Sequence, residues 1–374
     1  MEKLAKPTVL CLFGGNSTEY EVSCRSFNSV AENIDGEKFN IIKAGITKNG
    51  EWNIYAGPNE KIRDLSWIND DKNLFPCALI PKNKAYKKAY LCKFTDGYIN
   101  SSGESFEKID IDVILPIVHG GNGEDGAIQG LAKLYEIPCA GADIIGSVCS
   151  FDKVITKILC AKIEGINMAD YIWFKRYDYD KDSGNILKLA EEKLGFPMFV
   201  KPANAGSSVG IYKVKERKDL ASAVLSSFGY DDKVIIEQNI TGKEIEVAVM
   251  GNGDTLIASC PGEINPNADF YDYDTKYIND TAEYFIPAGI DEKTSEKVRE
   301  LAKKVYMAVG AGGFSRVDFF VDENNKIYFN ETNTIPGFTE ISMFAKLMIY
   351  HEKITYKDVV TKIIELALEK QNNE

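Results

Sequence analysis

The sequence predicts a mixed α/β and α+β protein, in which an N-terminal parallel α/β domain precedes two α+β lobes. Two apolar runs, residues 8–13 and 113–118, each end in a glycine-rich turn and precede a helical pattern. This order is typical of parallel sheets, which bind ligands at the carboxyl ends of their strands. Later in the chain, a Gly-Asn-Gly turn at 251–253 joins two strand-like runs, and this spacing indicates an antiparallel hairpin.

The N-terminal domain is expected at residues 1–141. Its first strand, 8–13, leads to a helix from Ser23, and its second strand, 113–118, leads to a helix at 127–135. Between these elements, residues 57–105 are rich in Lys, Asp, Asn and Tyr and show no regular period. We therefore expect loops there, with one or two edge strands.

The central lobe is expected at 142–237 and the C-terminal lobe at 238–374. In the central lobe we expect helical structure at 147–163 and 220–227, and strands at 199–201, 209–214 and 234–237. In the C-terminal lobe we expect strands at 244–250 and 255–260, a helix at 297–309, and then two strands and two helices. Helices and hairpins mixed in this way predict two α+β lobes.

Composition and charge narrow the class of function. The 374 residues include 44 basic and 56 acidic side chains, and the formal net charge of −12 disfavours a nucleic acid or an anionic membrane as partner. No apolar run reaches the roughly 18 residues of a membrane-spanning helix, and the N-terminus lacks a signal peptide's apolar core. The eight cysteines form no C-x-x-C pair, which argues against a zinc site or a disulfide framework. We expect a cytoplasmic protein with free thiols.

The most specific pattern is a hairpin that carries two carboxylates. The Asn-Asn pair at 324–325 suits a two-residue turn, and in that register Asp318 faces Glu331 while Arg316 faces Asn333. All four side chains then lie on one face, because side chains alternate along a strand. Opposed carboxylates destabilise a hairpin unless a cation neutralises them, and oxygen ligands suit Mg²⁺. The alternative is an exposed hairpin with an arginine–carboxylate network.

Three further loops follow predicted strands. Residues 201–210 begin with Lys201 and offer backbone N–H groups to phosphate oxygens, and the alternative is a flexible hairpin tip. Residues 119–126 contain four glycines after a histidine, which could meet a substrate carboxylate or could be structural. After the first strand, Glu19 could bind an ammonium group, and the alternative is helix capping by an acid.

Two segments complete the set. Residues 270–277, FYDYDTKY, lie between a hairpin and a helix, and we interpret them as a lid or as an ordinary packed surface loop. Residues 333–339 continue from the predicted metal strand, where Gly337 can present its backbone N–H to a reacting carbonyl. A phosphate loop, carboxylates for Mg²⁺, lysines and an arginine together suggest the ATP-driven activation of a carboxylate.

With these motifs in this order, the sequence resembles the D-alanine–D-alanine ligase family of the ATP-grasp superfamily. The resemblance covers residues 13–342 and rests on FGGNSTEYEVS, HGGNGEDGAIQG, Asp152-Lys153, KPANAGSSVG, IIEQNITGKE, FYDYDTKY, RVDFF and NETNTIPGFT. It implies that the two α+β lobes are ATP-grasp lobes, which bind ATP and two Mg²⁺ ions, with Mn²⁺ as an alternative. It also implies a homodimer.

The resemblance implies a role for each matched residue. The metal ligands would be Asp318, Glu331 and Asn333. ATP would be bound by Lys153, Lys201, Ser208, Glu237, Gln238, Ile240, Glu244, Phe270 and Lys276. The catalytic set would be Glu19, Ser207, Tyr277, Arg316 and Gly337, the first three of which would tie the lid to the site. The amino-acid substrates would be bound by Glu19, Val22, His119, Gly337, Ser342 and Met343.

The implied reaction joins two D-alanines through an acyl phosphate, for peptidoglycan precursor synthesis. D-Serine ligases of the vancomycin-resistance type usually carry an arginine where Met343 stands, and D-lactate ligases a histidine where Tyr277 stands, which favours D-alanine. Glu340-Ile341 and Ala345 depart from the family pattern in the same subsite, and they keep D-serine as the alternative. A non-catalytic ATP-binding relative is a remote alternative, because the metal, phosphate and arginine positions are all filled.

Overall fold

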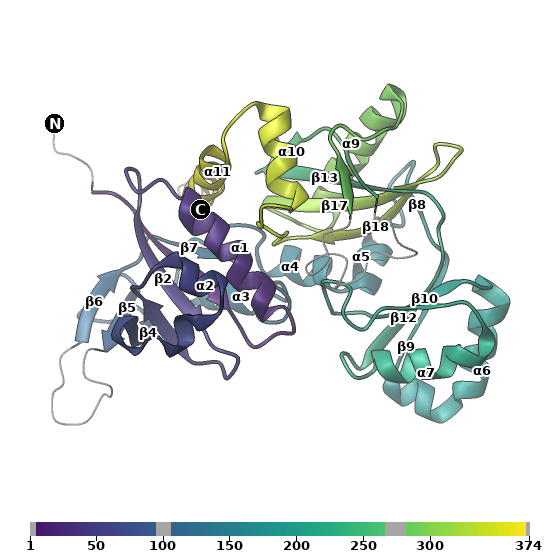
Figure 1. The fold of residues 1–374 in the computed structure, drawn as a ribbon, viewed down its shortest axis with the longest axis horizontal. Coiled ribbons are helices and arrows are strands. Elements are labelled where there is room, and N and C mark those ends of the chain that lie inside the picture. The colour runs from purple at the N-terminus through teal and green to yellow at the C-terminus, as the bar shows by residue number, and fades with distance from the viewer. Residues whose placement is uncertain (1–4, 95–105, 266–281, 372–374) are drawn as a thin grey trace.

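The computed structural model describes residues 5–94, 106–265 and 282–371 (Figure 1). Three β-sheets organise these residues. None of the helices in the described ranges is long and apolar enough to span a membrane.

The N-terminal sheet extends a parallel centre with antiparallel strands. Its strands are β1 (Thr8–Gly14), β2 (Asn40–Ile46), β3 (Trp52–Tyr55), β4 (Leu74–Ile80), β5 (Tyr90–Phe94), β6 (Phe106–Asp110) and β7 (Val113–Pro116), in the order β6-β5-β4-β3-β2-β1-β7. β1 pairs in parallel with β2 and β7, whereas the other neighbours are antiparallel. The predicted strands 8–13 and 113–118 are thus present, and β4 and β5 lie inside the sheet rather than at its edge.

The helices of this domain flank the glycine-rich turns. They are α1 (Tyr20–Asn33), α2 (Asn59–Arg63), the short 3₁₀ helices η1 (Ser66–Asn69) and η2 (Asp71–Asn73), and α3 (Ala127–Leu134). α1 begins three residues before the predicted start at Ser23, so that Glu19 stands at its N-cap. Phe27 of α1 stacks on Phe13 of β1 with ring centroids 4.6 Å apart, which fixes the helix on the sheet next to the site.

The central sheet is antiparallel and has its own core. It consists of β9 (Tyr171–Lys175), β10 (Met198–Pro202), β11 (Tyr212–Val214) and β12 (Lys233–Gln238), in the order β11-β10-β12-β9, with α6 (Arg176–Leu194) and α7 (Arg217–Ser227). Both helices bury residues in a core with β9, β10 and β12. The predicted strand at 209–214 is shorter than expected, because residues 209–211 belong to the loop before β11.

The predicted helical segment 147–163 consists of two helices, α4 (Ile144–Phe151) and α5 (Lys153–Cys160). The break is at Asp152, whose backbone is extended and whose carboxylate accepts hydrogen bonds from the N–H groups of Val154 and Ile155. An N-cap of this kind starts a new helix and fixes the direction of its first residue. That residue is Lys153, one of the predicted phosphate ligands.

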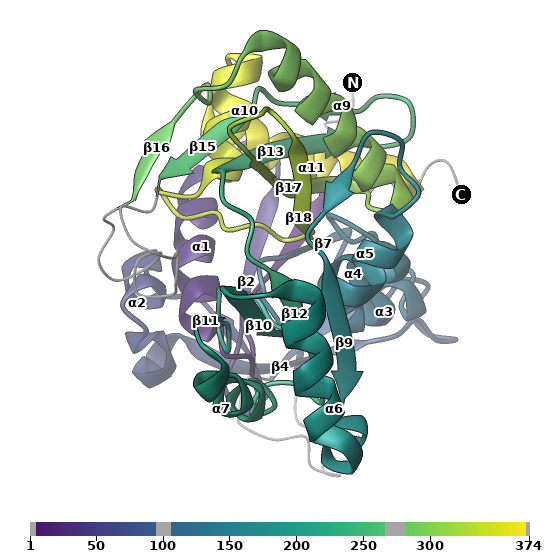
Figure 2. The same cartoon turned by 90° about the vertical axis from the view of Figure 1, so that its right-hand side faces the viewer.

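The C-terminal sheet contains the predicted metal hairpin. Its strands are β13 (Lys243–Gly251), β14 (Ile257–Ala258), β15 (Gly262–Asn265), β16 (Glu283–Phe285), β17 (Gly313–Val321), β18 (Ile327–Asn333) and β8 (Asn167–Met168). β14 pairs with β13 as the predicted hairpin requires, and the other strands follow the order β16-β15-β13-β17-β18-β8. The helices are α9 (Glu292–Ala308), α10 (Met343–Glu352) and α11 (Tyr356–Gln371). Figure 2 shows this sheet above the central sheet.

The N-terminal domain and the C-terminal lobe share one hydrophobic core. Residues of β1, α1 and β7 belong to the same buried cluster as residues of α10 and α11. α4, α5 and β8, which the expected boundary at 142 assigns to the central lobe, instead contact the C-terminal sheet and α9. The division into three parts stays a proposal, with the central lobe confined to β9–β12 and their helices.

Candidate active site

The β17–β18 hairpin pairs the predicted metal residues in the expected register, although its turn differs from the predicted one. Asp318 lies opposite Glu331 and Arg316 lies opposite Asn333. The turn is not the predicted two-residue turn: Asp322 pairs with Lys326, and the three residues 323–325 connect the strands. A bulge between Asp318 and Phe319 then shifts the register by one residue and restores the predicted pairs.

A third strand adds a further carboxylate to this face. Glu246 of β13 lies opposite Asp318, so that Glu246, Asp318 and Glu331 form a row across three strands. Arg316 is the cation beside this row. Its Nε and Nη2 atoms donate to the two Asp318 oxygens at 2.8 and 2.6 Å, and its Nε lies 3.1 Å from Glu246 Oε1. Although burial alone would lower it, the pKa of Arg316 is raised by Asp318 and Glu246, so the guanidinium stays charged.

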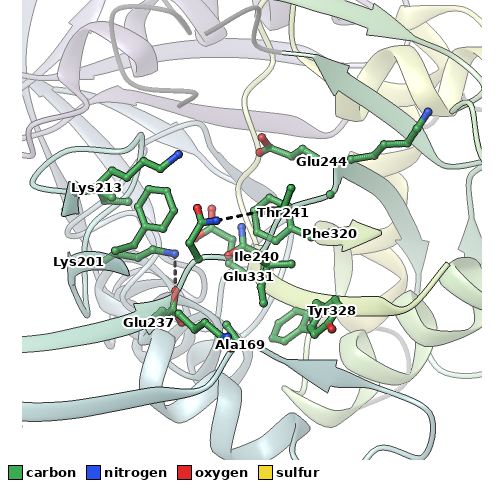
Figure 3. A pocket seen from close by; sticks show the side chains of 18 of the residues that line it. Ala169, Lys201, Lys213, Glu237, Ile240, Thr241, Glu244, Phe320, Tyr328 and Glu331 are labelled. Atoms are coloured by element: carbon green, nitrogen blue, oxygen red, sulfur yellow. Dashed lines mark hydrogen bonds and ion pairs between the residues drawn. The ribbon is translucent and has the colours of Figure 1, made fainter. Parts of the chain in front are cut away.

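A cavity of about 510 Å³ lies between the central and C-terminal sheets (Figure 3). Phe199 of the central sheet and Phe320, Tyr328 and Phe329 of the C-terminal sheet line it, which suits a flat aromatic base. The predicted ATP residues that also line it are Lys201, Ser208, Glu237, Gln238, Ile240 and Glu244, together with Glu331.

At the base of this cavity, the Glu237 carboxylate is held between two lysines. Lys157 Nζ lies 2.7 Å from Glu237 Oε1, and Lys201 Nζ lies 2.5 Å from Glu237 Oε2. Burial would raise the pKa of Glu237, but Lys157 and Lys201 together lower it to about 2. The Glu237 carboxylate is therefore ion-paired on both oxygens in this structure, and its predicted contact with ATP stays a prediction.

The sequence prediction missed Lys157. It lies one helical turn after Lys153 on α5, so both lysines point from the same face of that helix. The spacing of four residues was a usable signal, although nothing in the sequence reveals that Glu237, on a distant strand, is its partner.

Replacing Lys157 by methionine is expected to lower the free energy of unfolding by about 3 kcal/mol, because the Glu237 carboxylate loses one of its two buried partners. Denaturant unfolding followed by circular dichroism measures the change. Lys188→Met is the matched control, since Lys188 is an exposed lysine of α6 whose side chain is 63% accessible. A loss no larger than that of the control would contradict the assigned pairing.

The loop at 203–211 connects the cavity to the metal hairpin. Ser207 and Ser208 have positive φ angles of 49° and 59°, and they form a turn that is closed by a hydrogen bond from the Val209 N–H to the Gly206 carbonyl oxygen at 3.0 Å. Lys153 Nζ donates to the carbonyl oxygen of Ala205 at 2.6 Å and lies 3.6 Å from Glu331 Oε2. Lys153, a predicted phosphate ligand, therefore lies between the loop and Glu331, a predicted metal ligand. From this position its ammonium group and a cation on Glu331 would both neutralise phosphate oxygens.

A second, smaller pocket of about 80 Å³ adjoins the cavity, and Ile264 and Glu331 line both. Its lining brings together ten of the predicted residues: Glu19, Val22, His119, Ser207, Arg316, Glu331, Asn333, Gly337, Ser342 and Met343. Ser207 Oγ donates to Glu19 Oε1, as expected for two members of the predicted triad. The third member, Tyr277, lies outside the described residues, as do Phe270 and Lys276.

His119 is a neutral bridge between two parts of the chain. Burial, with a smaller effect of Arg316, lowers its pKa to about 4. Its Nδ1 lies 2.9 Å from the carbonyl oxygen of Ile335 and its Nε2 lies 2.9 Å from Ser26 Oγ. A neutral ring next to a carbonyl oxygen must carry its proton on Nδ1, so Nε2 accepts from Ser26. Both nitrogens are engaged in this structure, although the ring still lines the pocket.

The low pKa of His119 predicts a pH-dependent contribution to stability. The unfolded state binds a proton below the ordinary pKa of 6.5, whereas the folded state does so only near 4, so stability is lost as the pH falls from 6.5. Between pH 7 and 5 we expect a loss of about 2 kcal/mol from this residue. Comparing denaturant unfolding of wild type and His119→Gln at both pH values isolates it, because other groups cancel. Equal pH dependence in both proteins would contradict a neutral buried ring.

The Glu340-Ile341 departure is divided between two pockets. Ile341 lines both the small pocket and a neighbouring hollow of about 140 Å³, whereas Glu340 lines only the hollow, together with Arg25 and Arg63. The added acid is therefore not among the residues that line the small pocket. Met343 is buried and lines the small pocket.

Two buried carboxylates of the site were not predicted, Glu124 and Glu246. Both line the second, smaller pocket. Glu246 could not be predicted because strand order is a long-range property. Glu124 could not be predicted because the glycines around it indicate only a close approach of the backbone. The assigned roles of all residues in the site remain predictions.

A cavity between two sheets, lined by lysines and ended by a carboxylate hairpin, defines the ATP-grasp class of ligases, and solved structures agree. The structure is similar to that of VanG D-Ala:D-Ser ligase from Enterococcus faecalis, with a TM-score of 0.83, 38% identity, and coverage of 97% of this chain and 100% of that chain. It is also similar to the D-alanine-D-alanine ligase from Coxiella burnetii, with a TM-score of 0.81, 30% identity, and coverage of 98% and 95%.

Sequence comparison gives the family within this class. The family model "D-ala D-ala ligase N-terminus" matches residues 8–142, and "D-ala D-ala ligase C-terminus" matches residues 160–365. The D-alanine–D-alanine ligase of Caldicellulosiruptor bescii is 42% identical over 372 residues, which cover 99% of this chain and 98% of the relative. The D-alanine–D-alanine ligase of Acetivibrio thermocellus is 41% identical over 370 residues, which cover 98% of this chain and 97% of the relative. The chain belongs to the D-alanine–D-alanine ligase family.

Proposed function

We propose that this enzyme joins two D-alanines into D-alanyl-D-alanine at the expense of ATP, through an acyl phosphate, for peptidoglycan precursor synthesis. The observation that carries the proposal is the shared wall of the two pockets. Glu331 lines both the nucleotide-sized cavity and the small polar pocket, so a γ-phosphate and a substrate carboxylate would meet at the β17–β18 hairpin. The names of the relatives support the choice of substrates.

In the first step, the carboxylate of the first D-alanine attacks the γ-phosphate and ADP leaves. Glu19, at the N-cap of α1, would bind the ammonium group of this substrate. Its hydrogen bond with Ser207 fixes the carboxylate against the phosphate loop. Lys153 and Lys201 would neutralise phosphate charge. Catalysis here is mostly a matter of positioning and charge neutralisation, because the reacting groups are both anionic.

In the second step, the amine of the second D-alanine attacks the acyl carbon and phosphate leaves. Arg316 and the Gly337 N–H group line the same pocket and would stabilise the tetrahedral oxyanion. Ser342 Oγ accepts from the Thr339 N–H at 3.0 Å, which holds the end of this loop where the second carboxylate would bind.

The donor set on the hairpin fits divalent cations. Asp318, Glu331 and Asn333 offer two carboxylates and an amide on adjacent strands, which are the hard oxygen donors that Mg²⁺ and Mn²⁺ prefer. With Glu246 in the same row, the acidic groups outnumber Arg316, so bound cations would relieve a local excess of negative charge. Bound Mg²⁺ would supply electrostatic stabilisation of the phosphate oxygens.

D-Alanine is favoured over D-serine as the second substrate by the apolar side of the pocket. Ile264, Ile341 and Met343 line this side. A serine hydroxyl placed against them would lose its hydrogen bonds to water. Apolar pockets reject an added hydroxyl only modestly, so we expect a preference of about 10- to 100-fold.

A competition assay tests the proposal. The enzyme receives ATP, Mg²⁺ and D-alanine, with and without equal D-serine or D-lactate, and mass spectrometry identifies the products. We expect D-alanyl-D-alanine as the main product in every mixture. Mainly D-alanyl-D-serine would overturn the choice of second substrate in favour of the alternative, which the similarity to the Enterococcus faecalis D-Ala:D-Ser ligase keeps open. ATP binding without any dipeptide would favour the non-catalytic alternative.

We also propose a cytoplasmic homodimer, in keeping with the family resemblance. Large apolar side chains are exposed on three successive helices that contact each other: Leu134 of α3 is 76% accessible, Ile145 of α4 66% and Ile158 of α5 55%. Burying them against a second copy would remove this surface from water. Sedimentation equilibrium is expected to give twice the 41.6 kDa chain mass, and a monomer at micromolar concentration would contradict the dimer.

A further inference from the structure

Both backbone polar groups of Ile335 are held by side chains of the glycine-rich loop that follows β7. Glu124 Oε1 accepts a hydrogen bond from the Ile335 N–H at 3.4 Å, and His119 Nδ1 donates to the Ile335 carbonyl oxygen at 2.9 Å. The partners are more than 200 residues apart in the sequence. Two side chains of the N-terminal domain therefore hold the two peptide groups on either side of one residue of the C-terminal lobe.

The same loop is held three residues later. The Phe338 N–H donates to Ser26 Oγ at 3.2 Å, and the Phe338 carbonyl oxygen accepts from the Tyr356 hydroxyl at 2.6 Å. The segment 335–338 is thus fixed at both ends by groups outside it. Gly337 lies between the two ends and lines the smaller pocket, where the amino-acid substrates are proposed to bind.

The other oxygen of Glu124 ties this segment to the first-substrate side of the pocket. Glu124 Oε2 accepts from the Gly120 N–H at 2.9 Å. Gly120 has a φ of 71°, and a Cβ there would lie 2.6 Å from Glu19 Oε2, so its backbone lies directly against the Glu19 carboxylate. One carboxyl group thus bridges the peptide beside Glu19 and the peptide that leads to Gly337.

The position of Glu124 argues against a role in fold stability alone. It is only 7% accessible and lines the pocket, and within residues 5–94, 106–265 and 282–371 its carboxyl accepts hydrogen bonds from the backbone N–H groups of Gly120 and Ile335 alone. Neither of these two donors is charged, so they offset only part of the desolvation cost of a buried carboxyl.

We propose that Glu124 is a positioning residue for acyl transfer, which sets the distance between the Glu19 subsite and the Gly337 N–H group. The inference rests on the proposed two-step ligation. Loss of the bridge would leave formation of the acyl phosphate largely intact, because the nucleotide cavity does not include this residue. It would slow capture of the intermediate by the second amino acid, so that water hydrolyses more of it.

The first test is the ratio of phosphate released to dipeptide formed. Glu124→Gln keeps the size of the side chain but turns an amide NH₂ towards one of the two backbone donors. We expect the ratio to rise at least about 5-fold, with an unchanged KM for ATP, because a lost hydrogen bond of this kind changes an equilibrium by about this factor. An unchanged ratio with a uniform loss of rate would overturn the proposal.

Asp125→Asn is the matched control. Asp125 is the next residue, its carboxylate also accepts from two backbone N–H groups, those of Asn122 and Ala127, and it does not line the pocket. Its substitution is expected to leave the phosphate-to-dipeptide ratio unchanged. A rise in the control equal to that of Glu124→Gln would assign the effect to loop stability and overturn the proposal.

Hydrogen exchange gives a second test that does not depend on activity. In Glu124→Gln we expect peptides covering 335–338 to exchange at least about 10-fold faster, while the β17 peptides stay unchanged. Unchanged exchange at 335–338 would overturn the bridge even in an inactive protein. Wild-type enzyme that makes no dipeptide would instead overturn the proposed function, so the two failures are distinguishable.

Discussion

Asp318→Asn is expected to lower turnover at least about 1,000-fold at saturating ATP and D-alanine. The substitution keeps the shape of a side chain that is 3% accessible, but it removes the charge at the centre of the carboxylate row. The residue is a predicted ligand of the divalent cations, so the cations that would neutralise the phosphate charge would be bound more weakly. Steady-state assays over a range of Mg²⁺ concentrations measure the effect.

Asp322→Asn is the control for this experiment, because it places the same substitution on the same hairpin. Asp322 accepts hydrogen bonds from the N–H groups of Asn324 and Lys326 at the turn, away from both pockets. The control is expected to keep turnover within about 3-fold of wild type. Asp318→Asn with activity within about 10-fold of wild type would reject the metal assignment.

Arg316→Met is expected to reduce both stability and turnover. Arg316 is the shared partner of Glu246 and Asp318, whose side chains are only 4% and 3% accessible. Removing the cation that lies between two buried carboxylates is expected to cost about 3–5 kcal/mol of unfolding free energy. Turnover per folded molecule is expected to fall about 100- to 1,000-fold, because the oxyanion loses its charged donor.

Arg299→Met separates these two effects. Arg299 lies on α9 and donates to the carbonyl oxygens of Ala258 and Ser259, outside both pockets. It is expected to lose stability while turnover per folded molecule stays close to that of wild type. If Arg316→Met behaved in the same way, Arg316 would be structural and the oxyanion assignment would be wrong.

The metal hairpin illustrates what sequence reasoning can and cannot reach. The pairing of Asp318 with Glu331 is correct, but two local features that the prediction lacked cancel each other. The turn contains three residues, with only Asn325 at a positive φ of 59°, and the bulge at Asp318 compensates for the extra residue. Bulges depend on the tertiary packing of the strand, so no local sequence pattern predicts this one.

The site as a whole was predictable where residues are neighbours in the sequence. His119 and Glu19 lie in loops after strands of the parallel centre of the N-terminal sheet, and their place at the carboxyl ends of these strands follows from topology. Lys201 lies near the end of β10, directly before the loop that the sequence predicts. The ion pair of Lys157 with Glu237 and the row from Glu246 to Glu331 were not predictable, because they depend on which strands and helices become neighbours in space.

The most direct test of the proposed reaction follows the carboxylate oxygen of the first substrate. The enzyme is given ATP, Mg²⁺ and D-alanine labelled with ¹⁸O in its carboxylate, and mass spectrometry reads the released phosphate and the dipeptide. An acyl-phosphate route predicts one ¹⁸O atom in phosphate for each D-alanyl-D-alanine formed, because the carboxylate oxygen that attacks the γ-phosphate leaves with it. Dipeptide formed with unlabelled phosphate would contradict the mechanism, and label in neither product would contradict the ligase activity itself.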